Sequence, residues 1–139
     1  MPVAPALLLD TCAMIYIAGG TRLEADASKA ILQAAENVRL HVSPISAWEV
    51  GMAVARNRIN TQLSAIDYFN TFLTRTGASL CGLDPEILVN ATALPGGVHK
   101  DPIDRILIAT ARFYNHVLVT SDRAILAYGE AGHVKILAC

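Results

Sequence analysis

Short, continuously apolar segments, each followed by a segment with helical periodicity, recur along this chain and limit its fold more than any other feature. The clearest are Ala6–Asp10, Leu40–Ser43 and Val117–Thr120, which we predict to be strands. Strands that are apolar on both faces are typical of parallel sheets covered by helices on both sides. Their alternation with helices implies right-handed crossovers. We therefore predict an α/β fold around a mostly parallel sheet of about five strands.

The remaining elements follow from periodicity and from residues that begin or end helices. Gly19 and Gly20 end the helix after the first strand, and Pro44 begins the helix after the second, which runs to about Arg56. A helix over Thr61–Thr76 is amphipathic, with Leu63, Ile66, Phe69 and Leu73 on one stripe. The other predicted strands are Ala78–Leu83 and His133–Leu137, and the other predicted helices are Ala27–Val38, Pro85–Ala93, Asp101–Asn115 and Asp122–Gly129.

The size and composition of the chain favour a single soluble domain. With 139 residues, no internal repeat and no linker, residues 1–139 are expected to form one domain. No run reaches the roughly 18 apolar residues that a membrane helix needs. Asp10 interrupts the apolar N-terminus and the first basic residue is Arg22, so a signal peptide is not expected and a cytoplasmic location is. Cys12, Cys81 and Cys139 are odd in number and widely spaced, as expected for reduced, mostly buried thiols.

Four carboxylates lie where an apolar segment meets the start of a predicted helix: Asp10, Glu49, Asp104 and Asp122. In an α/β protein such junctions fall at the carboxyl ends of strands, where parallel sheets form their binding crevices. Four acids gathered there would repel one another without a cation between them. Mg²⁺ or Mn²⁺ is the expected occupant, since these hard cations prefer carboxylate and water oxygens. Metal-assisted hydrolysis of a phosphodiester is the chemistry of such sites, so the pattern predicts a nuclease.

Helix capping is an alternative interpretation for some of these acids. Asp10 and Asp122 are each placed to cap the helix that follows. Glu49 has the spacing of a capping box with Ser46, although a helix that begins near Pro44 would leave Glu49 in its interior. On the same helix, Ile45, Trp48 and Met52 form a stripe that we assign to the core. Capping would have to explain several acids at once, and this favours the metal site.

Capping does not explain Asp104. The pair Asp101-Pro102 begins a helix well, with Asp101 as its cap. Asp104 instead shares a face with Leu107, Ile108 and Ala111, which we expect to be buried. Asp101 and Asp104 are also a like-charge pair at i, i+3, which costs a few tenths of a kcal/mol without a counter-ion.

The net charge of −1 does not exclude a nucleic-acid partner. If the four acids and Asp101 serve a metal site, seven acids remain against eleven Lys and Arg, so the rest of the chain carries a surplus of four positive charges. Arg105, Lys100 and Arg123 lie close enough in sequence to the acids to contact an RNA backbone, or are plain surface charges.

Other functional motifs are missing from the sequence. There is no G-x-x-x-x-G-K or G-x-G-x-x-G for nucleotides and no G-x-S-x-G for a serine hydrolase. His41, His99, His116 and His133 lack the spacing of zinc ligands. A phosphotransferase with an aspartyl nucleophile is a weak alternative, since its motif needs a second Asp where Cys12 stands.

Four segments of the chain, LLLDT, SPISAWEV, LPGGVHKDPIDRILIATA and VTSD, occur in the order of a known family. Together they resemble the PIN domain of VapC-type toxins from bacterial type II toxin–antitoxin systems, over nearly the whole chain. The most specific part is H-x-D-P-I-D-R followed by the L-I-A-x-A helix. Ile103 stands where such proteins often have Phe and Thr110 where they often have Gln, and neither change removes an acid.

This resemblance implies a three-layer α/β/α sandwich and a Mg²⁺-dependent endoribonuclease that a small antitoxin silences. By position, Asp10, Glu49, Asp104 and Asp122 would bind the metal. Asp101, Thr11, Thr120 and Ser121 would be accessory residues, the last two as hydroxyls at a strand end. A homodimer is also expected. The alternative is a PIN-fold module that binds RNA or protein without catalysis, against which the complete set of acids argues.

Overall fold

A computed structural model of the protein describes residues 4–96 and 101–139, and its described part is organised around a parallel sheet of five strands. In chain order the strands are β1 (Leu7–Leu9), β2 (Leu40–Val42), β3 (Ser79–Leu80), β4 (Val117–Thr120) and β5 (Ile136–Ala138). Their order across the sheet is β3-β2-β1-β4-β5, and each neighbouring pair is parallel. The predicted α/β fold with a parallel sheet is therefore confirmed.

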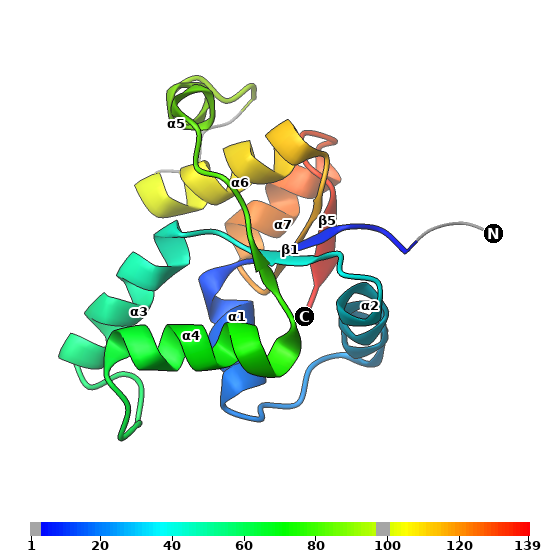
Figure 1. Ribbon diagram of the computed structural model, residues 1–139. Coiled ribbons are helices and arrows are strands. Elements are labelled where there is room, and N and C mark those ends of the chain that lie inside the picture. The colour runs from blue at the N-terminus through cyan, green and yellow to red at the C-terminus, as the bar shows by residue number, and fades with distance from the viewer. Residues whose placement is uncertain (1–3, 97–100) are drawn as a thin grey trace.

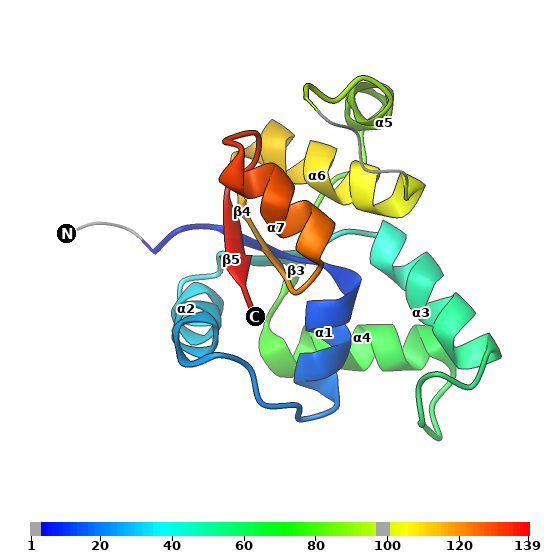
Figure 2. The ribbon, with the colours of Figure 1, turned by 180° about the vertical axis from the view of Figure 1, so that it is seen from behind.

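Seven helices cover the two faces of this sheet in the described part of the chain: α1 (Thr11–Ala18), α2 (Ala25–Glu36), α3 (Ile45–Ala55), α4 (Ala65–Thr76), α5 (Pro85–Ala91), α6 (Pro102–Tyr114) and α7 (Arg123–Glu130). Helices α1 to α4 pack on one face and α5 to α7 on the other, as Figures 1 and 2 show from opposite sides. The expected three-layer sandwich is confirmed.

The central strand β1 supplies side chains to both layers because consecutive residues of a strand point to opposite faces. Leu7 and Leu9 join the cluster under α1 to α4, whereas Leu8 joins the cluster under α5 to α7. All three leucines are buried, which explains why this strand is apolar at every position.

Helix α4 begins four residues later than its periodicity predicts. Ser64 caps it, accepting from the Asp67 amide at 3.2 Å, so Thr61 and Leu63 precede the helix in a turn. Leu63 and Ile66 are consequently exposed, and the buried stripe is formed by Phe69 and Phe72, with Leu73 packed beside them. The expected stripe is therefore only partly correct: Leu63 precedes the helix, which begins after the Ser64 cap, and Ile66 is exposed within it.

Smaller shifts affect the edge elements. The edge strand β3 contains only Ser79–Leu80, and β5 begins at Ile136 rather than at His133. Helix α2 ends at Glu36, because Val38 takes the left-handed backbone conformation at φ 55° and cannot continue a helix. Within the described residues, no helix has the length and apolar character needed to cross a membrane.

Candidate active site

The reversal of strand order between β1 and β4 places two of the predicted acids side by side. From β1 the chain proceeds to β2 and β3 on one side and later to β4 and β5 on the other. Asp10 directly follows β1, and its amide donates to the Val119 carbonyl of β4 at 3.0 Å. Asp122 lies two residues beyond the end of β4. Crevices for ligands form outside the carboxyl ends of strands at such a reversal.

Asp10 is buried, with 4% of its surface exposed, and both of its carboxylate oxygens accept hydrogen bonds. Oδ1 accepts from the Ala13 amide at 2.7 Å, which caps α1, and Oδ2 accepts from the hydroxyl of Thr120. Burial raises the pKa of Asp10, the two hydrogen bonds oppose that rise, and the charge of Asp122 adds to it. The capping interpretation of Asp10 is thus correct, and it coexists with a position among the other acids.

Thr120 links the two strand-end acids. Its hydroxyl donates to Asp10 and accepts from the Asp122 amide at 3.0 Å. Asp122 in turn caps α7 by accepting from the Ile125 amide at 3.0 Å. Because the single hydroxyl proton of Thr120 is directed at Asp10, this network fixes the orientation of one carboxylate and the backbone of the other. Ser121 lies half-buried between them.

Glu49 enters the site from α3 and is held by Thr11 at the start of α1. The Thr11 hydroxyl donates to Oε1 of Glu49 and lies 2.9 Å from the Ser46 hydroxyl. With its own proton on Glu49, Thr11 can only accept from Ser46. Ser46 is therefore directed at Thr11 rather than at an amide of its own helix, where Pro44 occupies the cap position. This arrangement replaces the capping box that the spacing suggested.

The pKa of Glu49 is raised, and the causes show which acids surround it. Burial has the largest effect, the bond from Thr11 opposes it, and the charges of Asp101 and Asp10 raise the pKa further. Asp101 is exposed and caps α6, accepting from the Ile103 amide at 2.9 Å. Asp104 is half-buried in the first turn of the same helix, ahead of the buried Leu107, Ile108 and Ala111.

The pKa of Cys12 is affected by all four predicted metal ligands. Burial of the sulfur and the charges of Asp10, Glu49, Asp104 and Asp122 raise its pKa to about 11. Asp10, Glu49, Asp104 and Asp122, which come from four different segments, therefore lie within electrostatic reach of one thiol. As a residue, Cys12 is exposed, so its assignment to the mostly buried thiols was wrong, whereas Cys81 is buried. The three cysteines are free, as predicted.

The donors of this site are chemically suited to Mg²⁺ or Mn²⁺, which prefer carboxylate oxygens. Burial and, to a smaller degree, repulsion between the acids raise the pKa values of Asp10 and Glu49 and so disfavour their ionised forms, and a cation would reverse that preference. Over residues 4–96 and 101–139, no three His, Cys, Asp or Glu side chains stand at ligand distances from a common point. Asp10, Glu49 and Asp122 instead accept hydrogen bonds from amides and hydroxyls.

The basic residues expected near the acids have different environments. Arg105 is half-buried and its Nε donates to the Ala91 carbonyl at 2.8 Å, which joins α6 to α5. Arg123 is exposed at the first position of α7. Lys100 lies outside the described residues.

Trp48 is not in the core, contrary to the prediction from its stripe with Ile45 and Met52. It is 56% exposed, and α3 buries Ser46 and Val50 instead. The contact of Ser46 with Thr11 turns that side of the helix inward, and Trp48 is thereby directed to solvent. Ser46 itself was missed as a site residue, although its i, i+3 spacing from Glu49 placed both on one side of a helix.

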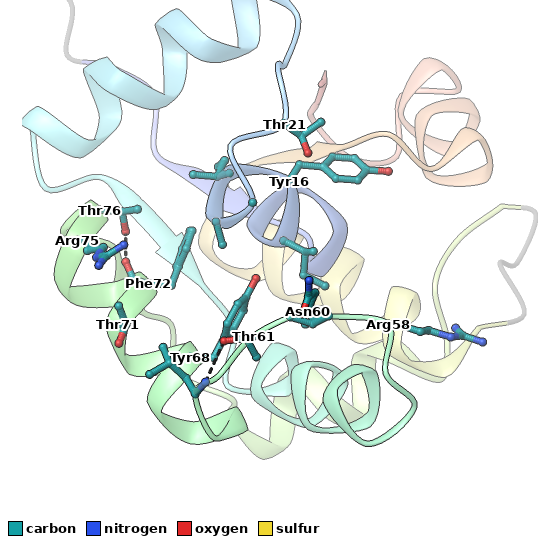
Figure 3. A pocket seen from close by; sticks show the side chains of 16 residues that line it. Tyr16, Thr21, Arg58, Asn60, Thr61, Tyr68, Thr71, Phe72, Arg75 and Thr76 are labelled. Carbon is teal, nitrogen blue, oxygen red and sulfur yellow. Dashed lines mark hydrogen bonds between the residues drawn. The ribbon is translucent and has the colours of Figure 1, made fainter.

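A cavity of about 620 Å³ lies on the α1 to α4 side, between α1, the turn before α4 and α4 itself. Figure 3 shows Tyr68 and Phe72 of α4 facing the end of α1 that carries Tyr16, with Arg58 and Arg75 at opposite ends of the cavity. The acids are not among its lining residues; they lie at the opposite end of α1, next to Thr11.

Comparison with known proteins identifies similar sequences and folds. The family model of the PIN domain matches residues 7–131. Ribonuclease VapC22 of Mycobacterium tuberculosis is 31% identical over 131 residues, which cover 94% of this chain and 97% of that protein. A chain in the crystal structure of VapBC2 from Rickettsia felis bound to a DNA fragment from their promoter superposes with a TM-score of 0.70 at 14% identity, covering 95% of this chain and 97% of that one. A domain of a functionally unknown protein from Methanocaldococcus jannaschii superposes with a TM-score of 0.55 at 15% identity, covering 98% of this chain and 91% of that one.

Proposed function

The chain belongs to the PIN-domain family and is of the VapC type, and on this premise we propose that it is a metal-dependent endoribonuclease and the toxin of a type II toxin–antitoxin pair. The observation that carries the proposal is the gathering of Asp10, Glu49, Asp104 and Asp122 around Cys12 at the strand-order reversal. The matched relative that is named a ribonuclease covers 94% of this chain, and the PIN family model matches residues 7–131, a range that contains all four positions.

We propose that these four carboxylates hold Mg²⁺, with Mn²⁺ as a substitute. When bound, such an ion lowers the pKa of a coordinated water and neutralises charge on the phosphate. The chain's own contribution is to hold the acids in place before any ion arrives. Thr120 and the Ala13 amide fix both oxygens of Asp10, and Thr11 fixes one oxygen of Glu49. Pre-set ligands of this kind reduce the ordering that binding requires.

Within this proposal the substrate is RNA, and a cytoplasmic location follows because RNA and a newly made partner are both present there. Arg123 is the candidate for a phosphate contact that the structure supports best, because it is exposed and directly follows Asp122. Arg105 is a weaker candidate, since its Nε is already engaged by Ala91. Asp101 would act as an accessory through its charge on Glu49.

We also propose an antitoxin partner that uses the cavity between α1 and α4. Helix α1 runs from the acidic site to the cavity: its first residue, Thr11, contacts Glu49, and its last turn lines the cavity. Seven residues of helix rise about 10 Å, so a segment seated in the cavity could extend an Arg side chain to the acids. Tyr68→Ala should then abolish inhibition by the neighbouring gene product while RNA cleavage continues. Tyr114→Ala, on the opposite layer, is the matched control.

A homodimer remains part of the proposal. Leu88 and Val89 of α5 and Phe113 of α6 are exposed apolar side chains on two helices that pack together. Light scattering of the purified chain would measure its mass in solution, and a monomer at all concentrations would contradict this part.

Cleavage of RNA by the purified chain tests the proposed activity. We expect cleavage with Mg²⁺ or Mn²⁺, none in EDTA, and none for Asp104→Asn, which keeps the side-chain shape and removes one negative charge. Asp26→Asn, an exposed acid in the first turn of α2, is the control and should cleave normally. Equal cleavage in EDTA would refute metal dependence, and no cleavage under any condition would favour a binding module.

A further inference from the structure

Trp48 is the single tryptophan of the chain and directly precedes Glu49, yet 56% of it is exposed. A large aromatic side chain that is left in solvent is an unused binding surface. Trp48 is next to Glu49, one of the proposed metal ligands, so the substrate of the metal site is the first candidate to bind this side chain.

The packing of α3 fixes the direction in which this side chain faces. Ala47 and Val54 pack into the cluster under α1 to α4, and α4 runs along that side of the helix. Ile45 packs into the other cluster, which includes Leu107 and Ile108 of α6. Trp48, three residues from Ile45, is exposed and belongs to neither cluster. Trp48 thus lies on the side of α3 that is turned away from the cluster under α1 to α4.

The first turn of α6 lies beside the first turns of α3. Both ribbon views place these helix ends next to each other (Figures 1 and 2), and the charge of Asp101 raises the pKa of Glu49. Trp48 therefore lies in the same turn of α3 as Glu49, with its side chain exposed to solvent. A strand of nucleic acid that reached those acids from solvent would pass it.

The surface next to the indole is uncovered. Gly51 lies one turn beyond Trp48, and a Cβ built on Gly51 would meet no atom within 4 Å. The exposed indole therefore has open space one turn away along the helix, and a nucleobase needs such room to stack on it.

We propose that Trp48 is a stacking platform for one nucleobase of single-stranded RNA, next to the phosphate that the acidic site acts on. Stacking suits this position because an indole carries no charge that could pair with a phosphate, whereas every base has a face that an indole can bind. The inference rests on the proposed function and specifies how that site recognises its substrate class. Trp48 is a positioning residue in this scheme and takes no part in the chemistry.

The fluorescence of the intact chain tests this directly, because the only indole is the one in question. The probe is a short mixed-sequence single-stranded RNA, added in Ca²⁺, whose looser coordination favours binding over cleavage. We expect saturable quenching of the tryptophan emission. An equally long ribose-phosphate chain without bases should bind more weakly and quench little.

Variants separate stacking from a structural role. Trp48→Ala should weaken RNA binding about tenfold, raise KM to a similar degree and leave kcat nearly unchanged. Trp48→Phe should recover part of the affinity. Gly51→Leu should mimic the loss while keeping Trp48, and Leu32→Ala, an exposed apolar residue on α2, should have no effect.

Each of the following outcomes would overturn the inference: no emission change when RNA is bound, an unchanged KM for Trp48→Ala, or equal quenching by the chain without bases. Emission that changes on dilution without RNA, and not on RNA addition, would assign Trp48 to a contact between copies and would also overturn it. Quenching without cleavage by the wild-type chain would instead refute the proposed activity and leave the platform standing.

Discussion

The hydroxyl of Thr120, the last residue of β4, donates to the buried carboxylate of Asp10, the first residue after β1. The two residues are 110 positions apart in sequence, and adjacent parallel strands bring them together. One hydroxyl thereby joins the two sides of the strand-order reversal at which the acids gather. The same oxygen accepts from the Asp122 amide, so its loss would loosen two acids together.

Thr120→Val should therefore weaken both the site and the fold. Without the hydroxyl, the pKa of Asp10 should rise further, because the bond that opposes the effect of burial is gone. We expect a loss of about 1–3 kcal/mol in the free energy of unfolding and about 10- to 100-fold weaker metal binding. Urea unfolding and the Mg²⁺ dependence of cleavage measure the two effects.

Thr110→Val is the matched control for that substitution. Thr110 is equally buried, but its hydroxyl donates to the Ile106 carbonyl of its own helix at 2.7 Å. Its replacement should affect stability alone. A Thr110→Val protein that needs as much additional Mg²⁺ as Thr120→Val would show that the effect is not specific to the acids.

The metal-free chain should lose stability as the pH rises from about 4 to neutrality. The pKa values of Asp10 and Glu49 are raised in the folded state, so each carboxyl is more easily ionised in the unfolded chain. Each carboxyl therefore contributes to the free energy of unfolding at pH values below its pKa in the unfolded chain. That contribution is lost as the pH rises through its pKa in the folded chain. Urea unfolding in EDTA across this range measures the slope, and Asp10→Asn should reduce it.

The same unfolding experiment in Mg²⁺ serves as a control, because it shows whether the pH dependence comes from the acids that would bind the ion. A bound cation favours the ionised carboxylates, so the decline toward neutral pH should shrink or reverse. A slope that is the same in EDTA, in Mg²⁺ and in Asp10→Asn would mean that these acids do not interact as the structure indicates.

Alkylation of Cys12 should become faster when Mg²⁺ is added. Burial, together with the charges of four carboxylates, raises the pKa of this thiol to about 11, and a cation among the carboxylates would lower the pKa and increase the thiolate fraction. Cys81 is the control within the same chain, since burial alone raises its pKa to about 11. Mass spectrometry after iodoacetamide treatment resolves the two sites. An acceleration shared equally by Cys81 would point to a general change in the fold.

The sequence predicted the strand–helix junctions well because each carries its own local signal. An apolar strand, an acid and a helix follow one another at Asp10 and Asp122, and Asp101-Pro102 begins a helix in the same way. The three acids at these junctions cap their helices, so the local signal and the position of the acid coincide. Which junctions lie next to each other depends on the order of the strands in the sheet. The alternation of strands and helices predicted a parallel sheet but not this order.

What the sequence did not predict depends on contacts between distant segments. The hydrogen bond of Ser46 to Thr11 sets the rotation of α3, and that rotation exposes Trp48 although the helical stripe assigned it to the core. Leu63 was expected on the helical stripe but precedes the helix, since Ser64 begins α4 later than its apolar periodicity suggests. Periodicity identifies a helix, but its rotation and its first residue depend on individual polar contacts.

The central claim, that Asp10 and its neighbours bind a metal ion, is tested most directly by titrating Mn²⁺ into the RNA-free chain in a calorimeter. The wild-type chain should bind Mn²⁺ saturably, and Asp10→Asn and Glu49→Gln should each weaken that binding at least tenfold, while Asp26→Asn should leave it unchanged. The substitutions keep side-chain shape, so a loss of affinity reports charge and ligand atoms. If Asp10→Asn and Glu49→Gln bind Mn²⁺ as tightly as the wild-type chain, the account of the acids as a metal site is wrong.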